Sequence, residues 1–161
     1  DVVAFNDPVS NTFAAMYDGQ IMDVEDFHAK KYEAGHGFIA YEDINGNLKV
    51  FEDGAIETIS TFPDFFEVKD SLVLFSEANM MKVYYKGEVH QLENFVPFKR
   101  SMKNGIIAYK NQNNGVTAFI SGKKVEVTNE FVTDVSVNGN AVYFTNQNDR
   151  VMVYWNGRVY N

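Results

Sequence analysis

Histidines and carboxylates are the side chains of this sequence that could bind a metal ion. The chain has three histidines, His28, His36 and His90, and no cysteine. The histidines fall in different parts of the chain, without the close spacing that a zinc site needs. The segment from Glu42 to Asn47 has some ligands of a calcium loop but lacks the bidentate Glu that completes one. We therefore expect neither a metal site nor a cofactor.

Paired carboxylates could instead cleave a glycosidic bond, a reaction that needs two of them about 5–9 Å apart. Asp64, Glu67 and Asp134 are the candidates, because each stands near a strand predicted to be the first of its sheet. The sequence contains no Gly-x-Ser-x-Gly nucleophile motif, no phosphate-binding loop and no dinucleotide fingerprint. We therefore assign no catalytic residue, and the sequence favours a binding protein over an enzyme.

Polar turns recur along the chain and supply the candidate binding residues. Each turn is rich in Asn and Asp and follows a short apolar run. These residue types are typical of tight turns, but on a protein rim the same amides and carboxylates can hydrogen-bond a glycan or a protein loop. Two adjacent methionines at one turn could adapt to many partners. The candidate binding residues are Asn11, Asp43, Asn45, Asn79, Met80, Met81, Asn113, Asn114, Asn146, Asn148 and Asp149.

The turns belong to a repeat that runs through the whole chain. Its first mark is a polar residue and a glycine between an aromatic or apolar segment and a β-branched residue. The glycines are 35, 33, 35 and 35 residues apart, at Gly19, Gly54, Gly87, Gly122 and Gly157. Its second mark is a phenylalanine eight or nine residues later, at Phe27, Phe62, Phe95 and Phe131. Its third mark is a short apolar run ending in an aromatic residue, which precedes each glycine. Three marks that recur in the same order at one period indicate an internal repeat.

Each repeat has the pattern of β-strands. In the last repeat we expect strands over 131–137, 141–145 and 151–155, and a fourth from residue 158 onward. Asp53-Gly54 and Asn156-Gly157 are typical of two-residue hairpin turns. Helix content should be close to nil, and residues 24–34 are interpreted as a strand, a link and another strand. Stacked four-stranded meanders favour a β-propeller over the alternatives, a β-solenoid or a sandwich.

Residues 132–157 resemble a blade of the β-propeller repeat superfamily, which includes WD-repeat, NHL and quinoprotein-type blades. The first strand, tight turn, second strand, long turn and third strand follow in the order of a generic blade. Trp155-Asn156 falls where a WD repeat carries Trp-Asp, but no copy has the Gly-His of that family. The resemblance therefore implies an all-β propeller and carries over no functional residue.

We interpret the chain as one propeller domain over residues 1–161. The approximate blades are 1–26, 27–61, 62–94, 95–129 and 130–161. The first repeat lacks its first strand. The chain is therefore expected to be either a compact five-bladed ring or part of a longer propeller, and we favour the second alternative. A part of a ring would expose apolar sheet faces and so need another protein, a second copy or the remaining part of the same chain to cover them.

Composition narrows the function classes. The chain has 161 residues and a formal net charge of −8, which disfavours nucleic acid as a partner. No apolar run is long enough to insert into a membrane. We expect a non-enzymatic module for protein–protein interaction or scaffolding, in a larger protein or in an envelope or secreted complex. The alternative is a glycan-binding or glycoside-processing propeller with acidic residues at its channel mouth. A periplasmic, cell-envelope or secreted location is expected, with the cytoplasm as the alternative.

Overall fold

The computed structural model describes residues 2–161 and consists of β-strands and turns. Nineteen strands form five antiparallel sheets, and the described residues contain no helix. Accordingly, no helix among them is long and apolar enough to cross a membrane. By contacts, the chain divides into two compact units, residues 1–91 and 92–161, with the boundary inside one strand of the third sheet. The expectation of an all-β fold with almost no helix is confirmed.

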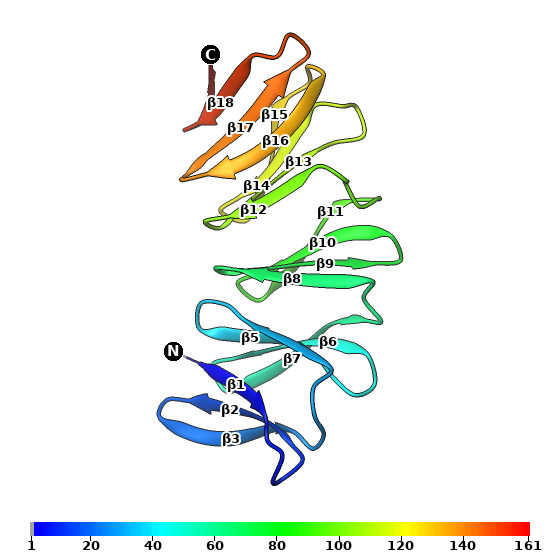
Figure 1. The fold of residues 1–161 in the computed structure, drawn as a ribbon, viewed down its shortest axis with the longest axis vertical. Helices are drawn as coiled ribbons and strands as arrows, with labels where there is room; N and C mark the ends of the chain where they lie inside the picture. The colour runs from blue at the N-terminus through cyan, green and yellow to red at the C-terminus, as the bar shows by residue number, and fades with distance from the viewer. Residues whose placement is uncertain (1) are drawn as a thin grey trace. The chain divides into compact units, whose positions relative to one another are not determined.

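The strands of each sheet follow one another in chain order (Figure 1). The first sheet contains β1 (Val3–Asn6), β2 (Phe13–Tyr17) and β3 (Gln20–Glu25). The second contains β4 (Lys31–Ala34), β5 (Phe38–Glu42), β6 (Asn47–Glu52) and β7 (Ala55–Thr61). The third contains β8 (Phe65–Lys69), β9 (Leu72–Glu77), β10 (Met80–Tyr85) and β11 (Glu88–Glu93). The fourth contains β12 (Arg100–Lys103), β13 (Ile106–Lys110), β14 (Val116–Ile120) and β15 (Lys123–Thr128). The fifth contains β16 (Val132–Asn138), β17 (Ala141–Asn146), β18 (Val151–Trp155) and β19 (Arg158–Tyr160).

These strands match the expected ones closely. The four strands predicted for the last repeat correspond to β16, β17, β18 and β19, and the link predicted within residues 24–34 separates β3 from β4. The first sheet has three strands in the described part of the chain, which agrees with a first repeat that lacks its innermost strand.

The repeating glycine has a backbone reason. It is the second residue of the hairpin between the third and fourth strands, and both turn residues have positive φ, as at Asp53 (51°) and Gly54 (78°). This conformation fits the twist of a two-residue hairpin and is easiest for Gly, Asn and Asp. The turn therefore fixes the register of each outer strand pair. Phe51 faces Ile56 across the hairpin that follows it, for example.

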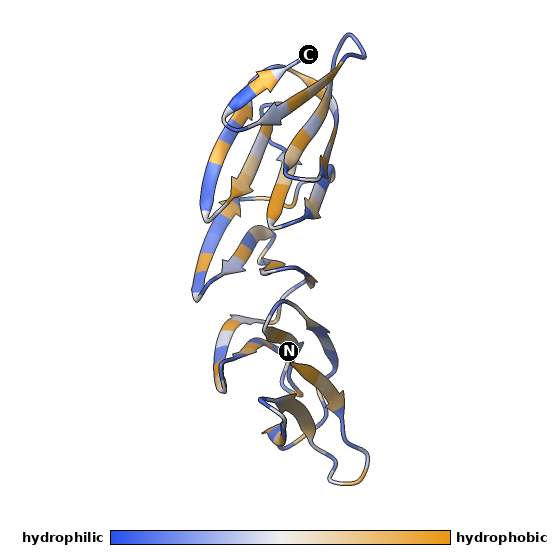
Figure 2. Ribbon diagram, turned by 90° about the vertical axis from the view of Figure 1, so that its left-hand side faces the viewer, coloured by the Kyte–Doolittle hydropathy of each residue, from blue (hydrophilic) through white to orange (hydrophobic). Residues whose placement is uncertain are grey.

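Sheets pack on one another through the alternating side chains of their middle strands. In the first unit, Leu48 and Val50 of the second sheet share a buried cluster with Val73 and Phe75 of the third. In the second unit, a cluster of the same kind joins the fourth and fifth sheets. Figure 2 colours the residues by hydropathy and shows apolar stretches on strands of both units. Within each unit, the middle strands of adjacent sheets thus bury their apolar side chains against one another.

One aromatic slot recurs in this packing. Phe51, Tyr84 and Phe119 occupy the same position of their repeats and are 2%, 4% and 1% exposed. Tyr154, the fourth member, is half-buried against the cluster of the second unit. Phe51 thus packs between the first and second sheets, and Tyr84 packs between the second and third.

Polar contacts join the innermost strands of neighbouring sheets. Lys31 Nζ donates a hydrogen bond of 2.6 Å to the carbonyl oxygen of Phe66, 35 residues later. In the second unit, the main-chain N–H of Val137 donates to Ser101 Oγ at 3.1 Å, across 36 residues. Because these bonds span one repeat, they connect equivalent strands. They fix how one sheet is set against the next, which apolar packing alone would leave less defined.

Loss of a slot aromatic should unfold the first unit more easily. We expect Phe51→Ala to lower its free energy of unfolding by about 3–5 kcal/mol, because the substitution leaves a cavity between two sheets. Urea denaturation followed by circular dichroism measures this change. Phe98→Ala is the control, because Phe98 is 94% exposed, and a change within about 0.5 kcal/mol is expected there. Equal losses in both variants would contradict the role of the slot.

Candidate functional site

The candidate binding residues lie in or beside the turns that join the second and third strands of the sheets. In the three-stranded first sheet, the equivalent turn joins β1 and β2. Since every sheet is a plain meander, this turn comes at the same end of each sheet. Within each unit these turns therefore form a row of short polar loops, which we call the Asx turns. Some candidates lie in the turns themselves, whereas Met80, Met81 and Asn146 lie at the adjoining ends of strands β10 and β17.

Asp43 shows how such a turn is held. Its Oδ1 accepts hydrogen bonds from the main-chain N–H groups of Asn45 (2.9 Å) and Asn47 (2.8 Å). Its Oδ2 lies 3.0 Å from Lys49 Nζ. Burial by itself raises the pKa of this carboxyl, but the hydrogen bonds from Asn47 and Lys49 outweigh burial and lower it. Asp43 is 3% exposed and already fully engaged, so it supports the turn and lies outside the exposed surface.

The same capping recurs in the second unit. Asn111 Oδ1 accepts from the N–H groups of Asn113 and Gly115, both at 3.0 Å. Asn146 Oδ1 accepts from the N–H groups of Asn148 (2.9 Å) and Arg150 (3.1 Å). An Asx side-chain oxygen that accepts hydrogen bonds from the backbone of its own turn stabilises that turn. The hydrogen bonds within its own turn therefore explain why residue 146 is an asparagine.

A second set of candidates is explained by backbone conformation. Asn11, Asn79, Asn114 and Asp149 all have left-handed φ values, of 62°, 61°, 65° and 58°. Gly46 holds the equivalent position of the second sheet, with φ of 87°. Asn, Asp and Gly adopt this region at the lowest cost, so the turn selects them. Their side chains are nevertheless exposed and free to contact a partner.

The methionine pair is divided between surface and core. Met81 is 0% exposed and faces Ser76 across the β9–β10 hairpin, whereas Met80 is half-buried at the turn. Met81 therefore packs in the core and cannot line an exposed surface, because successive strand residues point to opposite faces. The exposed members of the predicted set are Asn11, Asn45, Asn79, Asn113, Asn114, Asn148 and Asp149.

The structure adds phenylalanines to this surface. Phe27, Phe62 and Phe131 lie in the links between sheets and are 54%, 74% and 47% exposed, while Phe95 is half-buried. They are the recurring phenylalanines of the repeat, which the sequence analysis did not include among the candidate binding residues. The available signal was their position outside the strands, where Pro63 follows directly after Phe62.

These link phenylalanines sit against the Asx turns. The main-chain N–H of Phe62 donates to the carbonyl oxygen of Gly46 at 2.9 Å, and a Cβ at Gly46 would come within 3.0 Å of the Phe62 ring. Phe62 itself has φ of 52°, a strained conformation for an aromatic residue. In the second unit, Lys110 Nζ lies 4.3 Å from the centre of the Phe131 ring. Each such pairing sets an apolar ring next to the polar groups of a turn.

Two equivalent pockets open beside the Asx turns. The first, of about 230 Å³, is lined by Glu25, Asp26, Phe27, Asp43, Ile44, Asn45 and Lys49. The second, of about 380 Å³ in the second unit, is lined by Glu93, Asn111, Gln112, Asn113, Thr117, Lys124 and Glu126. An ion pair lies in each, Lys49–Glu25 at 2.7 Å and Lys124–Glu93 at 3.3 Å. Each pocket contains more carboxylates than lysines, so both are acidic and suit polar contacts.

Two buried tyrosines form hydrogen bonds next to these pockets. Tyr41 Oη donates to Glu25 at 2.8 Å, and Tyr109 Oη donates to the carbonyl oxygen of Leu92 at 3.3 Å. Burial, reinforced by the neighbouring Glu25 and Glu93, raises the pKa of both phenols well above the usual range. The two tyrosines therefore stay protonated and act as hydrogen-bond donors that orient the pocket wall.

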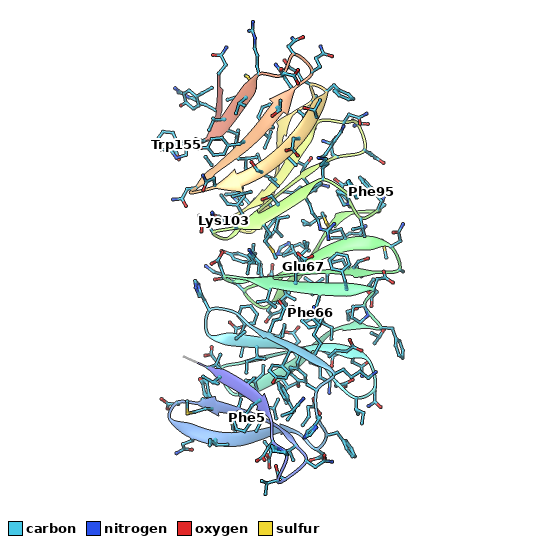
Figure 3. The ribbon with its side chains drawn as sticks, in the orientation of Figure 1. Phe5, Phe66, Glu67, Phe95, Lys103 and Trp155 are labelled. Carbon is cyan, nitrogen blue, oxygen red and sulfur yellow. The ribbon has the colours of Figure 1, made fainter. Side chains whose placement is uncertain are left out.

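A third, more apolar pocket of about 360 Å³ lies at the other end of the fourth and fifth sheets. Its walls include Ile106, Val142, Tyr154 and Trp155, together with the hairpin that contains Asn156. Trp155 is 49% exposed and projects from the end of β18 (Figure 3). Such walls suit an apolar side chain of a partner and offer little for acid–base chemistry.

The residues considered for catalysis are engaged elsewhere. Asp134 lies on β16, exposed, 3.3 Å from Lys99 Nζ. Asp64, just before β8, accepts a hydrogen bond from Ser76 Oγ at 2.9 Å, and Glu67 is exposed on β8 itself. His28 Nε2 donates to the carbonyl oxygen of Asp7 at 3.0 Å. Among residues 2–161, no three His, Asp or Glu side chains gather in a way that could hold a metal ion.

Stacked four-stranded meanders that meet face to face define a β-propeller. The chain belongs to the 10-bladed beta propeller domain family, whose model matches residues 1–160. The family description counts ten blades, which differs from the five that a closed ring of this chain would have. No curated protein matches the chain.

Solved structures with similar folds include natural and designed propellers. Kluyveromyces lactis Hsv2 is 14% identical, with a TM-score of 0.50 over 94% of this chain and 57% of that chain. Human WBSCR16 is 6% identical, with a TM-score of 0.47 over 90% of this chain and 57% of that chain. The computationally designed Ika4 protein is 13% identical, with a TM-score of 0.41 over 80% of this chain and 91% of that chain. The chain thus spans little more than half the length of these natural propellers, and at such identities the likeness concerns the fold alone.

Glu77, at the turn end of β9, gives the turns a measurable pH dependence. Its carboxylate lies 2.6 Å from Lys82 Nζ and accepts a hydrogen bond of 2.8 Å from Ser60 Oγ. These two contacts lower the pKa of Glu77 from 4.5 to about 2. The ionised carboxylate therefore stabilises the fold above the unfolded-state pKa, and this stabilisation fades as the pH falls from 4.5 toward 2.

We expect Glu77→Gln to flatten the fall of the melting temperature over that acidic range, as followed by circular dichroism. The neutral amide cannot lose a charge when the pH drops. Glu57→Gln serves as the control, because Glu57 is exposed on β7 and its loss should leave the acidic slope unchanged. Identical slopes for wild type and Glu77→Gln would show that this carboxylate does not couple folding to protonation.

Proposed function

We propose that the chain is a non-enzymatic propeller module that binds another protein through its Asx turns and link phenylalanines. The observation that carries the proposal is the exposure of phenylalanine at equivalent positions, 54% at Phe27, 74% at Phe62 and 47% at Phe131. Single exposed apolar residues are ordinary, but an exposed aromatic at the same place in three repeats is a recurring feature of both units.

The neighbours of these rings support a protein as the ligand. An aromatic ring supplies a large apolar contact, and the exposed amides of Asn45 and Asn113 both donate and accept hydrogen bonds. The strained φ of 52° at Phe62 points the same way, because local strain is concentrated at functional sites. An apolar ring bordered by turn amides is the arrangement by which loops on a rigid scaffold recognise other proteins.

The state of the carboxylates supports binding over catalysis. A general acid needs a raised pKa, whereas hydrogen bonds and Lys partners lower the pKa of Asp43 and Glu77. Glu25 and Glu93 lie in ion pairs. We therefore give the acidic residues of the turns a structural and recognition role.

Selection of binding peptides tests this function. A phage-displayed library of random peptides is selected against the 161-residue chain, and affinities are measured by surface plasmon resonance. We expect the selected peptides to bind Phe62→Ser/Phe131→Ser at least about tenfold more weakly, since loss of an aromatic anchor commonly costs more than 1 kcal/mol. Phe98→Ser is the matched control and should bind like wild type, because Phe98 is 94% exposed but lies outside the recurring position of the repeat.

Three results would overturn the proposal. Peptides that bind the double variant as tightly as wild type would place recognition elsewhere. A glycan array that gives signals where the peptide library gives none, or hydrolysis of a glycoside that Asp134→Asn abolishes, would favour the glycan-directed alternative.

A further inference from the structure

The two units of the chain carry opposite charge. Residues 1–91 contain 17 Asp and Glu against 6 Lys and Arg, which gives a formal net charge of −11. Residues 92–161 contain 5 Asp and Glu against 8 Lys and Arg, which gives a formal net charge of +3. The acidic character of the chain therefore resides in the first unit, and a charged partner that fits this unit is basic.

Lys110 shows what a link phenylalanine accepts in the second unit. Its Nζ lies 4.3 Å from the centre of the exposed Phe131 ring. An ammonium group at this distance is attracted by the negative face of an aromatic ring. In the first unit, Lys31 Nζ lies 4.1 Å from the centre of the Phe66 ring and 2.9 Å from Glu33 Oε1. A lysine that contacts both a ring and a carboxylate is thus an arrangement that this chain already contains.

The first unit has a carboxylate where the second unit has Lys110. Glu42 and Lys110 are each the last residue of the second strand of their sheets, β5 and β13. Each of these sheets is followed by a link that carries a recurring phenylalanine, Phe62 in the first unit and Phe131 in the second. The ring of Phe131 therefore receives a cation from its own chain, whereas the equivalent position beside the Phe62 link is acidic.

Glu42 and Phe62 border the same point of an Asx turn. A Cβ at Gly46 would lie 3.0 Å from the Phe62 ring and 3.8 Å from Glu42 Oε1. Phe62 is 74% exposed, the largest value among the recurring phenylalanines. Lys30 Nζ lies 3.6 Å from Glu42 Oε1, but the Lys30 side chain is 52% exposed, and an ion pair in solvent of this kind is weak. A cation of another molecule can therefore approach both the ring and the carboxylate from solvent.

We propose that the first unit recognises a Lys or Arg side chain of its protein partner, and that the Phe62 ring and the Glu42 carboxylate hold the cationic group. This inference rests on the proposed function, because it names the chemistry of the partner at the same surface. The ring supplies cation–π attraction, and the carboxylate supplies a charge-assisted hydrogen bond. The net charge of −11 on the first unit additionally attracts a basic segment from a distance.

The peptides selected against the 161-residue chain test the chemistry of the partner. We expect these peptides to contain Lys or Arg. Synthetic versions in which norleucine replaces Lys, or citrulline replaces Arg, keep a side chain of similar length and lose its charge. They should bind the wild-type chain about tenfold more weakly in surface plasmon resonance, because the cation–π and the ionic contact are both lost. This measurement uses the wild-type chain, so it does not depend on a variant that folds.

Variants of the first unit locate the bound cation. Glu42→Gln should weaken binding of the Lys or Arg peptide by about threefold and leave binding of its neutral version unchanged. Phe62→Leu keeps an apolar side chain without a ring and should weaken binding of the charged peptide by about three- to fivefold. Glu88→Gln is the matched control, because it removes the same charge from the first unit at the start of β11, the other end of its sheet from the Asx turn. The Glu88 side chain is 77% exposed, and this variant should bind like wild type.

The outcomes separate this inference from the function on which it rests. Peptides that bind through the link phenylalanines but lack Lys and Arg, or that tolerate the neutral replacements, would overturn the inference and leave the proposed function standing. Equal losses in Glu42→Gln and Glu88→Gln would also overturn it, because they would show attraction to the overall charge of the unit. Peptides that bind Phe62→Ser/Phe131→Ser as tightly as wild type would contradict the proposed function itself.

Discussion

Face-to-face burial of the middle strands is the constraint on which this structure depends. A four-stranded meander has two faces and no helix to cover either, so its stability comes from a neighbour on each side. The side chains of β5, β9 and β13 show the result. Apolar residues run along both faces of these strands, and Ile39, Val73 and Ile107 are all 0% exposed. In a protein with this architecture, each repeat is stable only as a member of a stack.

Apolar stacking alone would permit sheets to slide or rotate, and the polar contacts between innermost strands restrict that freedom. Glu33 Oε2 accepts from the N–H of Val68 at 2.9 Å, and Lys31 reaches the carbonyl oxygen of Phe66. In the second unit, Asn104 donates from Nδ2 to the carbonyl oxygen of Gly139, also 35 residues away. These side chains satisfy main-chain groups at the free edge of a neighbouring strand. They therefore align one sheet with the next, in addition to the stabilisation from apolar burial. They also block pairing of these strand edges with a strand of another molecule.

The sequence predicts this backbone well because the repeat constrains it locally. The hairpin glycines need positive φ, and the Asx residues cap turns, so both leave a visible period. Exposure is harder to predict, because it depends on neighbours from other repeats. Met80 and Met81 look alike in sequence, yet strand alternation sends Met81 into the core. Phe62 looks like a core residue, yet the link that carries it runs over the Gly46 turn and leaves the ring in solvent. Asp43 looks available, yet Lys49 and the turn backbone use all of its oxygens.

The two kinds of surface on this chain follow from different physical rules. Turns lie outside the stack, so their residues can vary without loss of the fold and can be adapted to one partner. Sheet faces lie inside it, and their alternating apolar residues fit any face of the same type. Val116 and Ala118 of the fourth sheet meet Val142 and Phe144 of the fifth in one buried cluster, which shows how such faces fit together. A substitution on a sheet face therefore affects the stability of the stack, whereas a substitution in a turn changes what the surface can bind.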